Sequence, residues 1–228
     1  MIVEKKMSRV ILCLSAFVTF LNFLPFTISS SKKCELNKLL NQNEILKDLE
    51  LTLPKQCLKT LQVQFPSGLE FLPGSELNLS RIRHQPMILN LHDLVEEDET
   101  LTIVMVDPDA PSRQNPKYRF VIIHEKGVTF FFQTLYQLTF CRQYLHWLVQ
   151  FNAKSLSFET LMEFMASSPP KGTGKHRYIL LAFSQKTTSL NKVIKNPSQR
   201  PNFQVAPFIS TNHLGNLVGV TFYFAQDE

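Results

Sequence analysis

The sequence lacks any block of basic residues longer than two adjacent lysines, although its net charge is +5. Proteins that bind nucleic acid through their charge usually carry a basic stripe or patch. We therefore expect no nucleic-acid partner. The 228 residues also contain no internal repeat and no low-complexity linker, which favours one domain of ordinary size with appendages.

The common signatures of catalytic and metal sites are missing as well. No serine lies in a G-x-S-x-G turn, and no cysteine stands where a nucleophile is expected. Asp107, His146 and His176 could together ligate a metal, but no pair of histidines has a metal-typical spacing such as HxxxH. We expect no metal, no cofactor and no enzymatic activity; acid–base chemistry by paired Asp and His side chains is the alternative.

Residues 1–31 have the pattern of a secretory signal peptide. A basic start, "MIVEKKMSRV", precedes the apolar run "ILCLSAFVTFLNFLPF" and the small residues of "TISSS". Pro25 and the short apolar run argue against a membrane anchor, and the lack of amphipathic character argues against a mitochondrial presequence; both stay open as alternatives. We predict a secreted, extracellular protein in which residues 32–48 form an N-terminal extension.

Two further features suit export. Cys34 and Cys57 lie 23 positions apart, and in an oxidising compartment they could close a loop that stabilises the fold by roughly 3 kcal/mol. Two free thiols are the alternative. Asn78 begins the glycosylation pattern "NLS".

Most of the chain reads as β-strand separated by Pro/Gly turns. Strand-like runs, rich in β-branched and aromatic residues, lie at 61–65, 87–91, 101–106, 145–151, 177–183 and 217–224. Helical periodicity is confined to 36–51 and 157–165. We expect a mainly β domain, and chiefly antiparallel pairing.

Two motifs that follow strands carry unusual chemistry. In "DPDAPSR" the prolines Pro108 and Pro111 restrict the backbone, so the carboxylates of Asp107 and Asp109 have little entropy left to lose. In "SPPKGTGKHRY", residues 168–178, glycines allow backbone N–H groups to approach a ligand. The run "KGTGK" lacks the spacing of a Walker phosphate loop.

Together with His146, these motifs suggest a site for a small anion. Histidines titrate near pH ~6.5, and a nearby carboxylate favours their charged form, so a protonated pair at His146 and His176 would hold a phosphate or carboxylate. A plainer interpretation also stands for each residue: Asp109 caps its turn, Arg113 pairs with it, and the histidines are satisfied core residues.

The motifs "DPDAPSRQNPKYR", "HWLV" and "PPKGTGKHRY", in this order, closely resemble the phosphatidylethanolamine-binding protein family, which includes a Raf-kinase inhibitor and plant flowering-time regulators. The resemblance runs over residues 49–228. It implies a large central antiparallel sheet, a smaller sheet, a few short helices and an anion pocket, with the Ala110–Pro111 bond often cis. The positions that match the family's anion site are Asp107, Pro111, His146, Ser168, His176 and Tyr178.

The sequence departs from the family pattern in several places. The family has almost nothing where Phe120–Arg142 stands, a segment of 23 residues rich in phenylalanine. Phe-Cys-Arg at its end can be encoded by a splice-acceptor sequence, so we expect a retained intron and predict that transcripts without it predominate; a lid is the alternative. Ser168 replaces a glycine, Phe164 stands where tyrosine is common, and the C-terminal helix of animal cytosolic relatives is missing.

The resemblance implies a secreted, non-enzymatic binder of phospholipid head groups or other small anionic amphiphiles. Two alternatives stay open. One is a protein-interaction regulator that inhibits a protease or modulates a kinase or signalling pathway. The other is a protein of the mitochondrial large ribosomal subunit, which also contains this fold.

Overall fold

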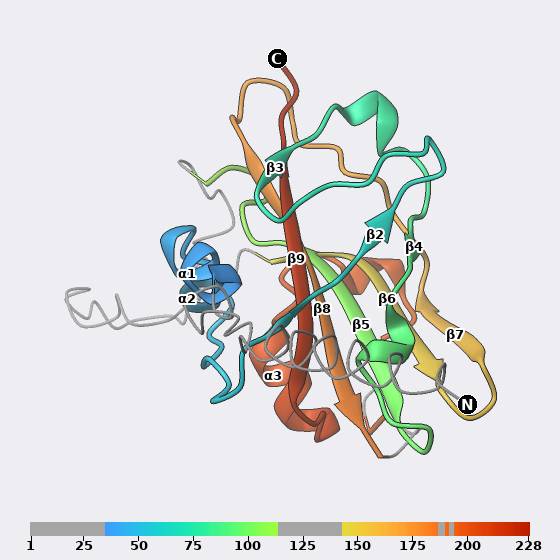
Figure 1. Cartoon of the computed structure of the whole chain (residues 1–228). Helices are drawn as coiled ribbons and strands as arrows, with labels where there is room; N and C mark the ends of the chain where they lie inside the picture. The colour runs from blue at the N-terminus through green and yellow to red at the C-terminus, as the bar shows by residue number, and fades with distance from the viewer. Residues whose placement is uncertain (1–34, 114–142, 187–189, 192–193) are drawn as a thin grey trace, which may run out of the picture. The chain divides into compact units, whose positions relative to one another are not determined.

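A seven-stranded sheet and a two-stranded sheet make up the β-structure of the described chain (Figure 1). The computed structural model describes residues 35–113, 143–186, 190–191 and 194–228. In the large sheet the strand order is β1-β9-β8-β5-β6-β7, with β3 also paired to β9. Its strands are β1 (Lys59–Thr60), β3 (Ser75–Glu76), β5 (Thr100–Asp107), β6 (Tyr144–Asn152), β7 (Ser157–Met162), β8 (His176–Gln185) and β9 (Leu217–Ala225). The small sheet pairs β2 (Val63–Gln64) with β4 (Met87–Ile88).

The mainly β class predicted from the sequence is confirmed, with one difference in pairing. The long strands β5, β6, β7, β8 and β9 all pair antiparallel with their neighbours. The short strands β1 and β3 pair parallel with β9, so the large sheet is mixed. Two-residue strands carry too little pattern to reveal their direction in a sequence.

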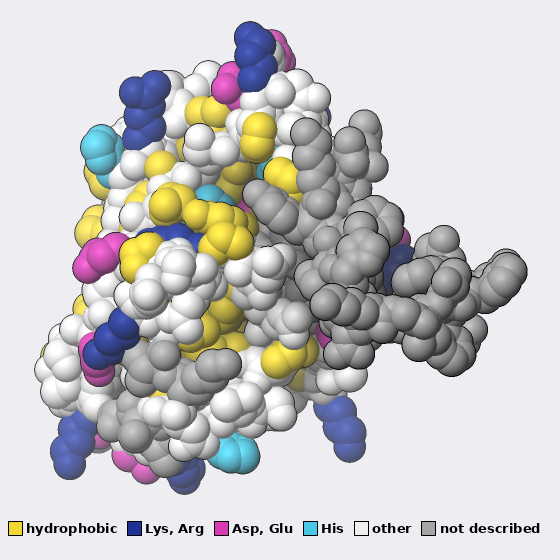
Figure 2. Space-filling model, turned by 180° about the vertical axis from the view of Figure 1, so that it is seen from behind, with side chains coloured by type: hydrophobic (Ala, Val, Ile, Leu, Met, Phe, Trp, Pro, Cys, Tyr) yellow, Lys and Arg dark blue, Asp and Glu magenta, His cyan; other side chains and the backbone are white. Residues whose placement is uncertain are grey.

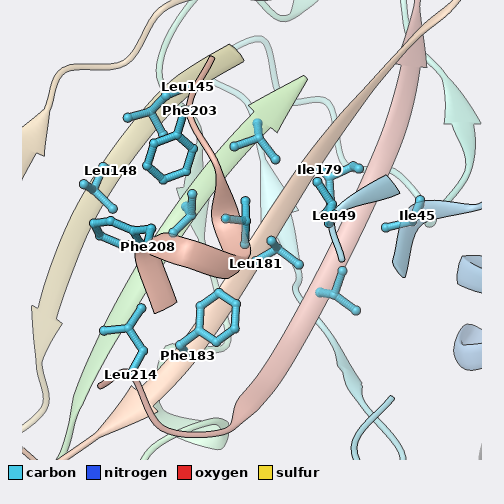
Figure 3. Close-up of a cluster of buried hydrophobic side chains, with 14 of the residues drawn as sticks. Ile45, Leu49, Leu145, Leu148, Ile179, Leu181, Phe183, Phe203, Phe208 and Leu214 are labelled. Carbon is cyan, nitrogen blue, oxygen red and sulfur yellow. The ribbon is translucent and has the colours of Figure 1, made fainter. Parts of the chain in front are cut away.

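Both faces of the central strands are covered, which explains their nearly continuous apolar runs. Every residue of β5 and β8 is buried. One face packs on α1 (Glu35–Gln42), α2 (Ile45–Asp48) and α3 (Val205–Asn212). Figure 3 shows Phe208 of α3 in one cluster with Leu148 and Leu181 of the sheet. The other face packs against residues of the small sheet and its loops, with Val63 and Phe65 among them.

The helices agree with the sequence prediction in one region and disagree in two. Residues 36–51 form α1 and α2, separated where Glu44 takes a left-handed backbone with φ 55°. The helix predicted over 157–165 is wrong, because Ser157–Met162 is strand β7 and pairs with β6. Its Glu, Leu and Met favour a helix locally, but the hydrogen bonds offered by the neighbouring strand decide the outcome.

The sequence did not predict α3. Its residues "VAPFISTN" include β-branched side chains and Pro207, all poor helix formers. Pro207 lies in the first turn, where a backbone N–H has no partner within the helix in any case. Burial of Val205 and Phe208 in the core supplies the stabilisation that propensity does not.

Some predictions fall on residues that the structure does not describe. The signal peptide at 1–31, Cys34 and the segment 120–142 lie outside the described residues. Cys57 is disulfide-bonded, and its pairing with Cys34 stays a prediction. No helix within the described residues is long and apolar enough to cross a membrane.

Candidate anion-binding site

The predicted site residues meet where three neighbouring strands of the large sheet begin or end. Asp107 is the last residue of β5 and His176 is the first residue of β8. His176 Nδ1 lies 2.7 Å from Asp107 Oδ2, and both side chains are buried. The other carboxylate oxygen, Oδ1, accepts a hydrogen bond of 2.7 Å from the backbone N–H of Asp109. The rigid turn therefore holds the carboxylate, and the carboxylate orients the imidazole.

The contacts of His176 fix the orientation of its ring. Its Nδ1 faces the carboxylate of Asp107. Its Nε2 lies 3.0 Å from Thr173 Oγ1, and that hydroxyl also donates to the carbonyl oxygen of Pro170 at 2.6 Å.

His146 is turned into the site by an irregularity in the sheet. Met105 of β5 pairs with Trp147 of β6. The next residue, Val106, pairs with Leu145, so His146 has no partner on β5. This is the geometry of a β-bulge, which re-aims a side chain and is common beside binding sites.

The bulge places the His146 ring against the aromatic rings of its neighbours. The ring lies edge-on to Tyr178, with centroids 5.1 Å apart, and 5.2 Å from the ring of Tyr144. Tyr178 also stacks with His176 at 6.5 Å. We call Asp107, His146, His176 and Tyr178 the histidine cluster.

His146 differs from the prediction in its protonation. Its Nδ1 lies 2.9 Å from the carbonyl oxygen of Met165 and must donate to it. Burial lowers the pKa of His146; Asp107 acts against this shift, and Arg200 and His176 reinforce it. The expected pair of protonated histidines is therefore wrong for His146, which carries a neutral ring near pH 7 and leaves Nε2 unprotonated.

Tyr178 brings a buried hydroxyl to the cluster. Among the described residues, its Oη makes no hydrogen bond of ordinary geometry, although the side chain is fully buried. Burial and then the charge of Asp107 raise the pKa of this phenol, and the backbone N–H of Ser168 only partly offsets them. The hydroxyl is thus a neutral donor with spare capacity. The fully buried Tyr223, which stacks on it at 5.3 Å, bonds Ser167 instead.

The remaining predicted residues lie at the rim of the cluster. Pro111 is half-buried, and the Ala110–Pro111 bond is cis, as the resemblance implied. Ser168 is exposed, and its backbone acts on the Tyr178 phenol. Sequence reasoning missed Tyr144 and Met165, whose side chains touch at 3.5 Å beside His146. Neither residue belongs to a recognisable motif.

A buried ion network backs the cluster on the helical face of the sheet. Arg177 follows His176 in β8 and so points to the opposite face. Its guanidinium makes a bidentate contact with Asp109 at 2.6 and 2.8 Å and reaches Asp48 of α2 at 2.6 Å. Burial opposes the charge of Arg177, but the hydrogen bonds and charges of the two carboxylates outweigh it and raise the pKa. Asp109 thus does more than cap its turn.

Other kinds of site find less support. No group of three His, Cys, Asp or Glu side chains that could hold a metal ion occurs within 35–113, 143–186, 190–191 and 194–228. A cavity of about 230 Å³ is lined by residues that include Phe203 and Phe208, but by none of the histidine cluster. It belongs to the helical face, so it is not the predicted anion site.

Comparison with models of protein families shows the family to which this chain belongs. The family model for phosphatidylethanolamine-binding proteins matches residues 68–224. The chain belongs to the phosphatidylethanolamine-binding protein family. All four residues of the histidine cluster lie within the matched range, so the cluster is part of the family domain and not of the N-terminal extension.

Two relatives that resemble this chain in sequence have different names. The carboxypeptidase Y inhibitor of Saccharomyces cerevisiae is 29% identical over 141 residues, and the chain covers only 62% of that relative's length. The protein named "Putative odorant-binding protein A5" of Drosophila melanogaster is 23% identical over 217 residues, which span 92% of this chain and 89% of that protein.

Solved structures of the phosphatidylethanolamine-binding protein family share the fold. The member from Plasmodium vivax gives a TM-score of 0.60 at 20% identity, covering 84% of this chain and 97% of its own. The carboxypeptidase Y inhibitor complexed with its cognate proteinase gives 0.58 at 23% identity, covering 84% and 94%. At these identities the likeness concerns the fold alone.

Proposed function

We propose that this protein is a non-enzymatic binder of small phosphorylated or anionic amphiphiles, and that the histidine cluster holds the anion. One observation carries this proposal. The Tyr178 hydroxyl makes no hydrogen bond of ordinary geometry among the described residues, although its side chain is fully buried beside His146 and His176. Buried polar groups normally find partners, and a bound oxygen-rich ligand would provide them.

The chemistry of the cluster suits a phosphate monoester. The Tyr178 hydroxyl donates, and His176 Nε2 can exchange its contact with Thr173 for one with a ligand oxygen. His146 Nε2 accepts a hydrogen bond from a protonated phosphate, or takes up its proton. Asp107 orients His176 through its Oδ2. Its Oδ1 accepts a hydrogen bond from the backbone N–H of Asp109, so both carboxylate oxygens already have partners within the protein.

An amphiphile also needs an apolar contact beside its anion. Met165, 40% exposed, and the half-buried Tyr144 stand next to His146. Figure 2 shows hydrophobic side chains exposed near the centre of one face of the molecule. Met165 and Tyr144 provide the apolar contact that the ligand needs beside His146.

Titration with phosphorylethanolamine tests the proposal. We expect the ring resonances of both cluster histidines to move in NMR spectra of the purified chain as the compound is added. Exposed His213 provides an internal control and should not move. If neither cluster ring responds up to millimolar concentration, the proposal fails.

A second candidate function is inhibition of a protease. Its support is the likeness to the carboxypeptidase Y inhibitor, which has been solved with its cognate proteinase. Assaying a panel of carboxypeptidases with and without the chain tests this idea. Inhibition that survives His176→Ala would assign it to a surface other than the histidine cluster, and no inhibition of any enzyme would remove its support.

We further propose that the protein is secreted, that Cys34 pairs with Cys57, and that Asn78 is glycosylated. Asn78 is exposed, and its Oδ1 accepts hydrogen bonds of 2.9 and 2.7 Å from Ser80 N and Oγ. Expression in a secreting eukaryotic cell should deliver a product to the medium that loses mass on treatment with an N-glycosidase. Asn78→Gln should abolish that loss; retention of the product inside the cell would contradict secretion.

A further inference from the structure

The histidine cluster poses a question of charge. His176 is paired with the carboxylate of Asp107 at 2.7 Å, so the two side chains together contribute no net positive charge. Burial lowers the pKa of His146, which favours its neutral ring, and its Nδ1 donates to the carbonyl oxygen of Met165. A site of this composition has no excess positive charge with which to attract an anion at neutral pH.

Arg200 lies directly behind His146 and provides the missing cation. It follows η5 (Pro197–Gln199) and is only 4% exposed. Its Nη1 donates to the backbone carbonyl of His146 at 2.9 Å and to that of Leu145 at 3.1 Å. Its Nη2 donates to the carbonyl of Glu163 at 2.7 Å. One guanidinium thus joins the bulge in β6 to the chain that leaves β7.

These contacts fix the backbone at the bulge. A β-bulge disrupts the regular ladder, and its carbonyl groups need other donors. Here the guanidinium of Arg200 donates to two of these carbonyl groups, those of Leu145 and His146. The backbone N–H of Leu145 in turn donates to the carbonyl oxygen of Arg200 at 3.0 Å. The N–H of Met165 also donates to the carbonyl of His146 at 2.8 Å. The direction of the His146 ring therefore depends on the guanidinium.

Among the described residues, no carboxylate lies close enough to Arg200 to neutralise its charge. No ion pair of Arg200 occurs among the described residues, and its buried Nε lacks a hydrogen-bond partner there. Glu163 contributes its carbonyl and only a longer-range charge. Burial lowers the pKa of Arg200 despite that charge. A buried, uncompensated cation is costly, and an anion bound at His146 would reduce the cost.

We propose that Arg200 is the permanent positive charge of the anion site and the residue that positions His146, so that anions bind even when His146 is neutral. This inference rests on the proposed function. Arg200 acts through His146 and through its field; it is not one of the groups expected to touch the ligand.

The pH dependence of binding follows from the groups around His146. The groups on strands that face it are Asp107 of β5, Tyr144 of β6, and His176 and Tyr178 of β8. Arg200 also faces it, and the charge of Glu163 acts on Arg200. In the native protein Arg200 keeps its charge throughout the neutral range. Binding should therefore weaken only gradually as pH rises above the range in which His146 and the phosphate take up protons.

Arg200→Gln and Arg200→Lys separate charge from positioning. Glutamine removes the charge, so phosphorylethanolamine should bind on the order of tenfold more weakly at about pH 8, with a steeper fall from about pH 6. The pKa of His146, followed by NMR without ligand, should rise. Lysine keeps the charge but cannot reproduce the fork of donors, so the pKa of His146 should stay low while affinity falls by about threefold.

Arg83→Gln is the matched control, because Arg83 is exposed just after the short helix η2 (Leu79–Arg81) and is not among the groups around His146. It removes the same net charge and should change neither affinity nor the titration of His146. An Arg200→Gln protein that binds like the native one at about pH 8 and leaves the titration of His146 unchanged overturns the proposal.

The outcomes also separate this inference from the proposed function. If the native chain does not bind phosphorylethanolamine, the proposed function fails, while the titration of His146 in the variants still decides whether Arg200 acts on it. If the glutamine variant does not fold, the lysine variant decides: native affinity together with unchanged resonances of the His146 ring would show that the fork of donors does not position His146, against the proposal.

Discussion

Tyr178 illustrates how one residue can be nearly neutral for folding and important for binding. Its hydroxyl is buried without a hydrogen bond of ordinary geometry to any described residue. An unsatisfied buried polar group lowers stability, so its presence is explained more readily by a ligand than by the fold. Tyr223, stacked on it, has the opposite character because Ser167 Oγ lies 2.7 Å from its hydroxyl.

The two tyrosines therefore predict opposite results for the same chemical change. Tyr178→Phe should leave the free energy of unfolding unchanged or raise it by up to about 1 kcal/mol, while phosphorylethanolamine binds about tenfold more weakly. Tyr223→Phe should cost about 1 kcal/mol of stability with little change in affinity. Urea denaturation and calorimetric titration measure the two quantities, and a destabilised Tyr178→Phe with native affinity would contradict this assignment.

The turn after β5 depends on a second carboxylate, Asp109, which is fully buried and held by the bidentate guanidinium of Arg177. Asp48 of α2 contacts the same guanidinium but is 33% exposed. Removing one partner of a buried ion pair leaves the other charge buried and uncompensated, whereas water can replace a solvent-accessible partner.

At the scale of elements, this network fastens α2 to the strand that carries His176. Asp109→Asn should lower the free energy of unfolding by about 3–5 kcal/mol, and Asp48→Asn by about 1 kcal/mol or less. Urea denaturation of the two variants provides the comparison. Equal losses would mean that the exposed contact with α2 contributes as much as the buried one.

The connection between α3 and β9 is tightly packed against the end of β8. A Cβ atom on Gly215 would overlap the backbone carbonyl oxygen of Ser184, and this carbonyl cannot move aside like a flexible side chain. Gly215→Ala should therefore cost about 2–4 kcal/mol. As a control, the chain offers exposed Gly172, where a Cβ would meet nothing within 4 Å but the backbone has φ 73°.

Gly172→Ala should cost only the strain of a left-handed backbone, about 1 kcal/mol. Thermal unfolding of both variants would rank the two effects. A Gly215→Ala protein as stable as Gly172→Ala would show that the connection adjusts more freely than the packing indicates.

For the molecule as a whole, His146 links stability to pH. Its pKa in the folded state is lowered, above all by burial, whereas in the unfolded chain it lies near ~6.5. Between these two values the unfolded state binds more protons, so stability rises with pH in that window. The contribution is fully present above the unfolded value and is lost as the pH falls through and below it.

His146→Gln should flatten this part of the profile. The native protein should lose more stability than the variant between about pH 8 and about pH 5, by about 1.4 kcal/mol for each unit by which the pKa is lowered. Urea midpoints at the two pH values measure the difference. Identical losses in both proteins would mean that the ring of His146 is not held neutral in the fold.

The sequence by itself determined four of the five long strands (β5, β6, β8 and β9), the family and the residue types of the candidate site. The long strands were predictable because buried residues in a strand leave a continuous apolar run. Asp107, His176 and Tyr178 were predictable because they lie in motifs whose prolines and glycines constrain the backbone locally. Such signals are short-range, so they need no knowledge of the rest of the chain.

Only the tertiary structure decided the properties that arise from contacts between distant segments. Strand β7 replaced a predicted helix because β6 offered it hydrogen bonds, and α3 formed because the core buried Phe208. His146 is neutral because burial lowers its pKa, and Arg200 lies behind it across 54 positions of sequence. Burial and through-space charge depend on the packed chain, so no local pattern could have revealed them.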